Sequence, residues 1–188
     1  MATNEEKHDK HFPLFYHYNP IRRLFFSNPK KYSQYITSGQ TIADIGCGPG
    51  YFTFQLAEAV GPTGTVYAVD SDTKAIKALE KRAKKQGYHN IKTFTASATN
   101  LSFIKDESVD FILADGLLCS MAPQHQESAV NEMKRILKTN RKAYLKAARA
   151  SWSYMSQTEW KKILEGFTVE QRNDDSDTGA FWAVVSRK

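Results

Sequence analysis

Short apolar segments alternate with amphipathic segments of helical periodicity from residue 41 to the end of the chain. This alternation predicts strands separated by helices, which is typical of a parallel sheet with helices packed on both faces. Two last strand-like segments flank the turn-rich sequence NDDSDTG (173–179), so we expect a closing antiparallel hairpin. The predicted class is α/β, with a doubly wound, mostly parallel sheet. The predicted strands are 41–46, 65–70, 91–96, 109–115, 142–147, 167–172 and 180–187.

Polar residues and glycine mark the ends of the predicted helices. Ser71 or Asp72 can cap a helix that Gly87 ends, because a side-chain oxygen satisfies a free N–H and glycine adopts the left-handed conformation of a helix stop. A further helix over roughly 124–138 is predicted to stop at Asn140, since asparagine also tolerates that conformation.

The first 37 residues differ in pattern from the rest. Residues 1–11 are polar and charged, lack the apolar core of a secretory signal and are predicted to be a disordered lead-in. Two short helices are expected within 19–36, each starting at an Asn-Pro pair with proline at the first helical position. We therefore expect an N-terminal tail with lid helices over 1–37, and a single ligand-binding domain over 38–188.

Length and composition are those of one globular domain: 188 residues, 41% hydrophobic and 24% charged. No apolar run approaches the roughly 18 residues that a membrane span requires, so none is predicted. The two cysteines, Cys47 and Cys119, have no CxxC spacing and imply neither a disulfide framework nor a metal site. A reducing cytoplasm is the simplest location.

The formal net charge is +6, which raises nucleic acid as a partner. Much of the excess falls in one predicted helix, TKAIKALEKRAKKQG (73–87). We interpret its lysines as a solvated face, since cations in a last turn also complement the helix C-terminus. Nucleic acid stays open but is not favoured. The basic residues expected nearer the ligand site are Arg22, Arg23, Lys146 and Arg149.

The sequence IADIGCGPG (42–50) follows the first strand and has glycines at three alternate positions. Ligands of open α/β sheets bind at the carboxyl ends of the strands, and glycine lets a ligand approach the backbone closely. A tight turn that binds no ligand would not need glycine at three alternate positions, so this alternative is less favoured. A dinucleotide site requires G-x-G-x-x-G, and Tyr51 occupies the position of its third glycine. The carboxylate of Asp44 also suits a cationic ligand better than a pyrophosphate.

This loop, followed by VYAVDSD (66–72), resembles the leading motifs of the class I S-adenosylmethionine-dependent methyltransferases. The segments 96–118 and 131–147 resemble later parts of that family, and the most similar subgroup is the small-molecule methyltransferases of the quinone-biosynthesis type. The resemblance implies a Rossmann-like fold and S-adenosylmethionine as cofactor. It also implies that Asp44 faces the methionine amino group, that the glycine loop faces the methionine backbone, and that Asp70 binds the ribose hydroxyls.

Two positions qualify the resemblance. Ser97 stands where the family often has an aspartate that binds the adenine amino group, and a hydroxyl accepts that bond more weakly. Adenine recognition is therefore expected to depend on the backbone N–H of Ala98 and on apolar packing near Ser71. Asp115, at the end of the fourth strand, could face either the methionine or the methyl acceptor. The implied cofactor-binding residues are Asp44, Gly46, Cys47, Gly48, Gly50, Asp70, Ser71, Ser97, Ala98 and Asp115.

The acceptor site is expected under the segment before the first strand and the loops after the fourth and fifth strands. It is covered either by the N-terminal helices or by a partner chain, so an oligomer stays open. No catalytic residue is identified. The aromatic and titratable candidates for the substrate pocket are Tyr16, Tyr18, His125 and Trp152.

The sequence thus predicts a methyltransferase that acts on a small organic molecule. One alternative is a methyltransferase of RNA or protein, although the fourth strand ends in ADGL and lacks the N/D-P-P-Y/F motif of amino-directed nucleic-acid methylation. The other alternative is a non-catalytic S-adenosylmethionine-binding regulatory or scaffold protein, which would need the same glycine loop and Asp70.

Overall fold

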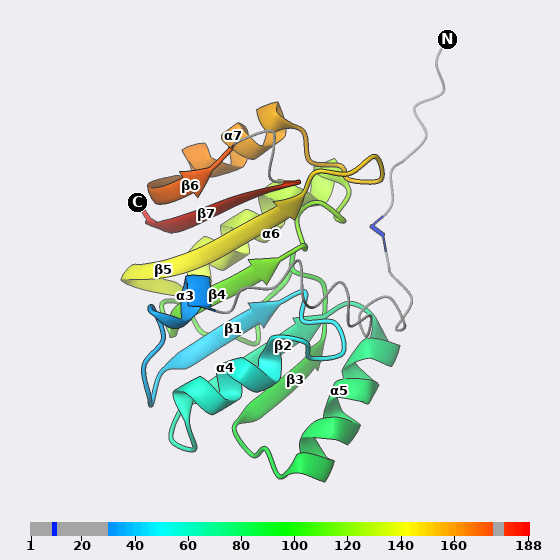
Figure 1. Cartoon of the computed structure of the whole chain (residues 1–188), viewed down its shortest axis with the longest axis vertical. Coiled ribbons are helices and arrows are strands. Elements are labelled where there is room, and N and C mark those ends of the chain that lie inside the picture. Colours follow the sequence, from blue (N-terminus) through cyan, green and yellow to red (C-terminus); the bar gives the residue numbers. More distant parts are fainter. Residues whose placement is uncertain (1–8, 11–29, 175–178) are drawn as a thin grey trace.

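A computed structural model of the chain describes residues 9–10, 30–174 and 179–188. Its strands are β1 (Thr41–Ile45), β2 (Thr65–Asp70), β3 (Ile91–Thr95), β4 (Val109–Asp115), β5 (Leu137–Ala148), β6 (Phe167–Asn173) and β7 (Ala180–Arg187). They form one sheet in the order β3-β2-β1-β4-β5-β7-β6 (Figure 1). β1 to β5 pair in parallel, and β7 runs antiparallel to β5 and β6. The predicted α/β class and its closing hairpin are confirmed.

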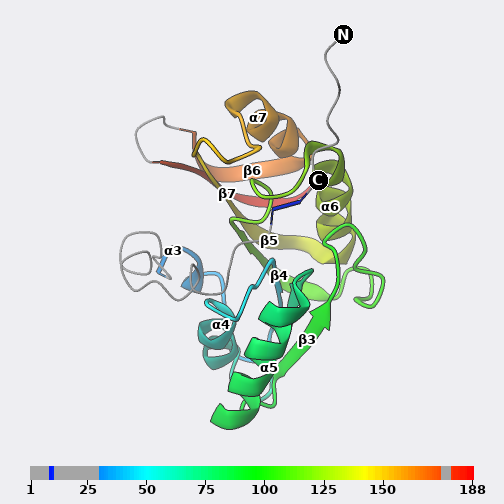
Figure 2. The same ribbon diagram turned by 90° about the vertical axis from the view of Figure 1, so that its right-hand side faces the viewer.

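Helices cover both faces of this sheet. They are α3 (Lys30–Ser33), α4 (Thr53–Val60), α5 (Thr73–Gln86), α6 (Pro123–Ile136) and α7 (Gln157–Glu165). Because successive side chains of a strand point to opposite faces, Ile42 of β1 packs in the cluster of α3 and α4, whereas Ala43 and Ile45 pack in that of α6 and α7. Figure 2 shows α4 and α6 on opposite sides of the sheet.

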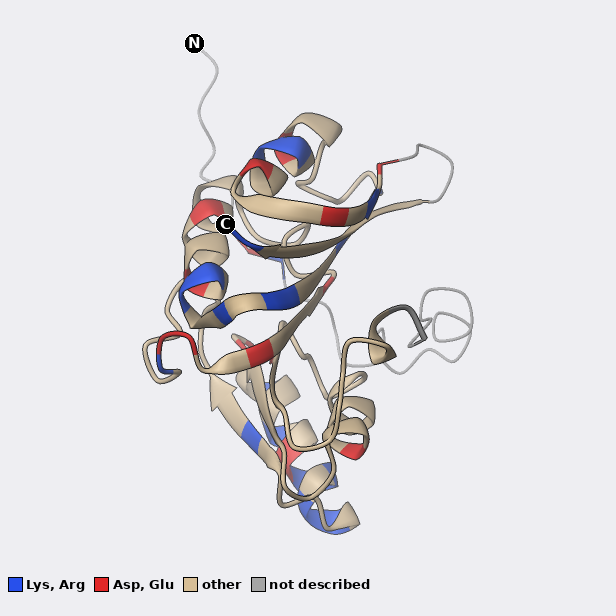
Figure 3. Cartoon of the chain, turned by 90° about the vertical axis from the view of Figure 1, so that its left-hand side faces the viewer, with Lys and Arg blue, Asp and Glu red and all other residues tan. Residues whose placement is uncertain are grey.

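The ends of α5 confirm two predicted caps. The Asp72 carboxylate accepts a hydrogen bond from the Lys74 N–H at 2.8 Å, and Gly87 ends the helix with a φ of 74°. The helix starts beside the end of β2 and runs away from it, so its last-turn cations, Lys84 and Lys85, lie far from that end (the lowest helix in Figure 3). Both are exposed, as expected for a solvated face.

The predicted end of α6 was wrong. The helix stops at Ile136, and β5 begins at the next residue. Asn140 does have a positive φ, 62°, but it lies inside β5, where the pairing with β4 shifts register. Tertiary contacts extend the strand: Leu137 is fully buried opposite Val109, and Lys138 forms an ion pair of 2.8 Å with Asp110.

Only part of the predicted N-terminal region lies within the described residues. The first of the two expected short helices lies outside them. α3 is described, and its Tyr32 is 3% exposed and packs against Phe52 and Tyr144. Within the described part of the chain, no helix has both the length and the apolar character needed to cross a bilayer.

Candidate functional site

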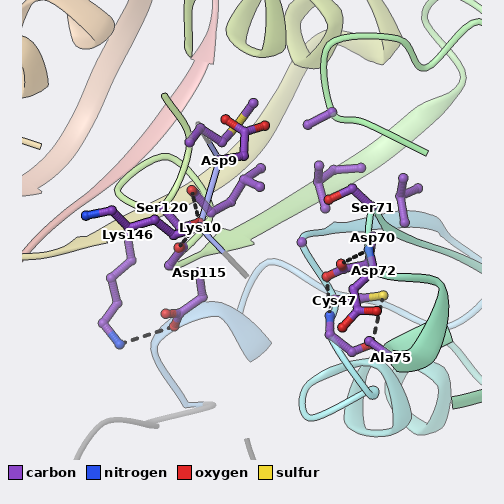
Figure 4. A pocket seen from close by; sticks show the side chains of 18 of the residues that line it. Asp9, Lys10, Cys47, Asp70, Ser71, Asp72, Ala75, Asp115, Ser120 and Lys146 are labelled. Atoms are coloured by element: carbon purple, nitrogen blue, oxygen red, sulfur yellow. Dashed lines mark hydrogen bonds and ion pairs between the residues drawn. The ribbon is translucent and has the colours of Figure 1, made fainter. Parts of the chain in front are cut away.

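A pocket lies at the carboxyl ends of β1, β2, β4 and β5. Parallel strands end at the same edge of a sheet, so residues distant in sequence converge there. Figure 4 shows Cys47, Asp70 and Asp72 on one side of this pocket, and Asp115 with Lys146 on the other. Eight of the ten predicted cofactor residues line it: Gly46, Cys47, Gly48, Asp70, Ser71, Ser97, Ala98 and Asp115.

The glycines of the loop after β1 have different surroundings. Gly48 has a φ of 54° and lines the pocket, where its N–H donates to Asp70. Gly50 has a φ of 88° but is not among the described lining residues. A Cβ at Gly50 would lie 2.4 Å from the Leu79 side chain on α5. Gly50 therefore allows the loop to pack on α5, whereas Gly48 keeps the backbone open toward a ligand.

Asp70 connects the loop to the start of α5. One carboxylate oxygen accepts the Gly48 N–H at 2.7 Å, and the other accepts the Asp72 N–H at 2.8 Å. A carboxylate has about four acceptor sites, so two remain for a ligand in the pocket that Asp70 lines. A pair of adjacent hydroxyls, as on a ribose, fits that capacity. The residues present therefore fit the nucleoside part of S-adenosylmethionine.

Asp44 lies behind the loop, outside the described lining of the pocket. Its carboxylate is 2% exposed and accepts a hydrogen bond from the Thr53 hydroxyl at 2.7 Å, at the start of α4. Burial raises the pKa of this carboxyl to about 7; the charges of Asp70 and Asp115 add to the rise, and the Thr53 bond opposes it. The predicted contact of Asp44 with the methionine amino group stays a prediction.

Asp44 predicts a pH dependence of stability. Its pKa is about 7 in the folded protein and near 3.8 in an unfolded chain, so between these values only the folded state binds the proton. The free energy of unfolding contributed by Asp44 therefore falls as pH rises from about 4 to about 7. Asp44→Asn should remove this decline, which urea unfolding at pH 5 and pH 8 would measure. Parallel pH profiles for both proteins would contradict the assignment.

The part of the pocket where the adenine is expected is lined by small residues. Ser97 and Ala98 follow β3 and line the pocket together with Ala96. The Ser97 hydroxyl lies 2.8 Å from the Thr99 hydroxyl and accepts the Thr99 N–H at 3.2 Å, which orders this turn.

Cys47 also lines the pocket, but burial raises the pKa of its thiol well above the ordinary value, so a reactive thiolate is not favoured.

An ion pair closes the side of the pocket opposite Asp70. Asp115 ends β4, and the β4–β5 register places Lys146 directly beside it. The Lys146 Nζ lies 3.2 Å from the Asp115 carboxylate, and each side chain is 16% exposed. The sequence marked Asp115 as a site residue but named Lys146 only among basic residues near the mouth, because strand pairing decides their contact.

Of the four predicted substrate-pocket residues, one lines the pocket, one does not, and two lie outside the described residues. Trp152, after β5, lines the pocket. His125 is not among its described lining residues; its Nδ1 lies 3.0 Å from the Asp9 carboxylate. Tyr16 and Tyr18 lie outside the described residues.

Sequence reasoning missed two N-terminal residues of the site. Asp9 and Lys10 line the pocket within a segment predicted to be a disordered lead-in. The Asp9 carboxylate accepts the Ala122 N–H at 2.7 Å, and the Lys10 N–H donates to the Ser120 carbonyl at 2.8 Å. The contacts reach across more than 100 residues of sequence, and the polar segment has no periodicity that could have indicated them.

Comparison with known families adds to this geometry. The model of a methyltransferase domain family matches residues 36–176. The chain belongs to this family. The matched segment contains β1 to β6 and the loop after β1, and it confirms the resemblance to class I S-adenosylmethionine-dependent methyltransferases. S-adenosylmethionine is the methyl donor of that class, which confirms the predicted cofactor of this methyltransferase domain.

Relatives and solved structures agree with the assignment. The demethylmenaquinone methyltransferase of Geobacillus stearothermophilus is 34% identical over 103 residues, which are 55% of this chain and 43% of that protein. A second, from Geobacillus kaustophilus, is 32% identical over the same shares. Less than half of each relative's length is thus matched. A methyltransferase structure from Aquifex aeolicus superposes with a TM-score of 0.78 at 21% identity, covering 95% of this chain and all of the other; at that identity the likeness concerns the fold.

Proposed function

We propose that this methyltransferase domain transfers a methyl group from S-adenosylmethionine to a small organic acceptor. The observation that carries the proposal is the Asp70 carboxylate, which joins the glycine loop to α5 and retains acceptor sites toward the pocket. When bound, S-adenosylmethionine supplies a methyl group on a positively charged sulfur. The residues of the chain bind and orient the two reactants and exclude water.

The proposed roles follow the position of each residue. Asp70 binds the ribose hydroxyls, the Gly46–Gly48 backbone faces the methionine part, and Ser97 with the Ala98 N–H meets the adenine. Asp44 has an indirect role: its carboxylate accepts the hydrogen bond from Thr53 at the start of α4 and so fixes the loop that joins β1 to α4. Residues 38–188 form the catalytic domain, and residues 1–37 act as its lid, which the docking of Asp9 and Lys10 supports. The two unpaired cysteines fit a reducing, cytoplasmic location.

The charge of the pocket favours a small acceptor over RNA. Its described lining contains four aspartates and two lysines: Asp9, Asp70, Asp72, Asp115, Lys10 and Lys146. This excess of carboxylates complements a cationic cofactor and opposes a phosphate chain. The demethylmenaquinone methyltransferases that match the segment support an acceptor of small-molecule type.

A transfer assay with methyl-labelled S-adenosylmethionine tests the proposal. The full chain is incubated with a cell extract separated into small molecules, RNA and protein, and S-adenosylhomocysteine binding is measured alongside. We expect label in the small-molecule fraction. Label in RNA or protein would reverse the choice of acceptor. Binding of S-adenosylhomocysteine without transfer to any fraction would favour the non-catalytic binder, and absence of binding would contradict the cofactor site.

A further inference from the structure

One cation of the basic helix α5 differs from the others in its surroundings. The five lysines of the helix are exposed: Lys74, Lys77, Lys81, Lys84 and Lys85. Arg82, in contrast, is half-buried, and its Nη1 group donates a hydrogen bond to the Pro49 carbonyl at 3.0 Å. The guanidinium carbon also lies 4.4 Å from the centre of the Phe54 ring, at the start of α4. A side chain within a run of solvated cations thus contacts the loop after β1.

The first half of this loop is held in place by β2. The Gly46 and Cys47 N–H groups donate to the Val69 carbonyl at 2.8 and 3.1 Å. The Gly48 N–H donates to the carboxylate of Asp70, at the end of the same strand. Because these bonds use backbone donors or the proposed ribose residue, the first half of the loop cannot be loosened without changing the pocket itself.

The second half of the loop is held by α5. Pro49 has no N–H to donate, and its carbonyl accepts the hydrogen bond from Arg82. The next residue, Gly50, lies against Leu79 of the same helix, where a Cβ would have no room. Leu79 shares a buried cluster with Phe54, and Figure 2 shows α4 and α5 as neighbours. Arg82 therefore joins the loop, α4 and α5 at one point.

Arg82 is not among the described lining residues of the pocket, so its contacts act on a ligand through the loop. A hydrogen bond from a charged donor is stronger than one from a neutral donor, and a planar guanidinium also stacks on a ring. Resting on the proposed function, we propose that Arg82 is a positioning residue for S-adenosylmethionine. It fixes the second half of the glycine loop in the shape that receives the methionine part. A loop that is ordered before binding loses less conformational freedom on binding, which raises the affinity.

Two ligands separate the methionine part from the nucleoside part. S-adenosylhomocysteine contains both, whereas 5′-methylthioadenosine lacks the amino-acid group. Arg82→Met keeps a long side chain beside Phe54 but removes the donor to Pro49. It should weaken S-adenosylhomocysteine binding by about 10-fold, the scale of one hydrogen bond to a charged group. The affinity for 5′-methylthioadenosine should stay near that of wild type, because the nucleoside is expected at Asp70 and Ser97. Isothermal titration calorimetry measures both affinities.

Hydrogen exchange of the loop gives a readout that needs no ligand. In Arg82→Met, the amides of residues 46–50 should exchange faster than in wild type, while those of β2 stay protected. A general loss of stability would instead raise exchange in both segments. Arg82→Lys should fall between the two proteins in exchange and in S-adenosylhomocysteine affinity, because an ammonium can donate to Pro49 but lacks the planar group that lies over Phe54.

Two variants of the α5 region serve as matched controls. Lys81→Met removes the neighbouring cation, which is exposed. Gly87→Ala strains the far end of the helix, where an added Cβ would have no neighbour within 4 Å. Both should bind S-adenosylhomocysteine like wild type. If Gly87→Ala loses as much affinity as Arg82→Met, the loss follows the stability of α5 rather than the contact with Pro49, and the inference is wrong.

The remaining outcomes separate this inference from the proposed function. Wild-type affinity of Arg82→Met for S-adenosylhomocysteine overturns the positioning role, and so does an equal loss of affinity for 5′-methylthioadenosine. If Arg82→Met does not fold, Arg82→Lys provides the same comparison, and a wild-type ratio of its two affinities contradicts the role. Failure of the wild-type protein to bind S-adenosylhomocysteine overturns the proposed function itself.

Discussion

Replacing Asp70 with alanine should weaken S-adenosylhomocysteine binding by about 1.5–3 kcal/mol, or about 10- to 150-fold in Kd. The carboxylate is expected to accept hydrogen bonds from the ribose, and hydrogen bonds to a charged group are the strong ones. The same side chain also holds the Gly48 and Asp72 N–H groups, so its loss loosens the loop that contacts the methionine part. Isothermal titration calorimetry on folded protein measures the effect.

Asp72→Asn is the matched control for this prediction. Asparagine can keep the cap bond to the Lys74 N–H while it removes a negative charge from the same wall of the pocket. The affinity of the Asp72→Asn variant for S-adenosylhomocysteine should therefore stay close to that of wild type. If Asp70→Ala binds as tightly as Asp72→Asn, the ribose does not lie at Asp70.

Gly50→Ala should lower the free energy of unfolding by about 2–5 kcal/mol. A φ of 88° strains any residue with a Cβ, by about 1–2 kcal/mol. The added methyl would also lie 2.4 Å from Leu79 and 3.0 Å from Phe54. Leu79 is fully buried in one cluster with Phe54 and Ile76, and overpacking of this kind costs about 1–3 kcal/mol more. Urea unfolding of the two proteins measures the difference.

Gly87→Ala separates the two contributions. Gly87 has a similar φ, 74°, but a Cβ there would have no neighbour within 4 Å. Its alanine variant should lose only the backbone term, about 1–2 kcal/mol. Equal losses at the two positions would mean that contact with Leu79 does not matter and that Gly50 is needed only for its backbone conformation.

Local patterns in the sequence were sufficient for most of the architecture. The segments of β2 and β4 were predicted at their observed bounds, and α5 has its observed caps, Asp72 and Gly87. These features depend on neighbours along the chain: apolar residues at regular spacing, a capping carboxylate and a residue that tolerates a positive φ. The end of α6 was missed because Leu137 and Lys138 are held by β4, a partner that no local pattern reveals.

The candidate site also has features that the sequence predicts and contacts that only the structure shows. The sequence by itself determined the α/β class, the glycine loop and the carboxylate at the end of β2, because each is written in a continuous segment. Only the tertiary structure decided that Gly50 packs on α5, that Asp44 turns toward Thr53, and that Asp9 reaches the loop after β4. It also decided that Asp115 meets Lys146 across two strands. These contacts join segments distant in sequence, and strand register, burial and loop docking, rather than local propensity, bring them together.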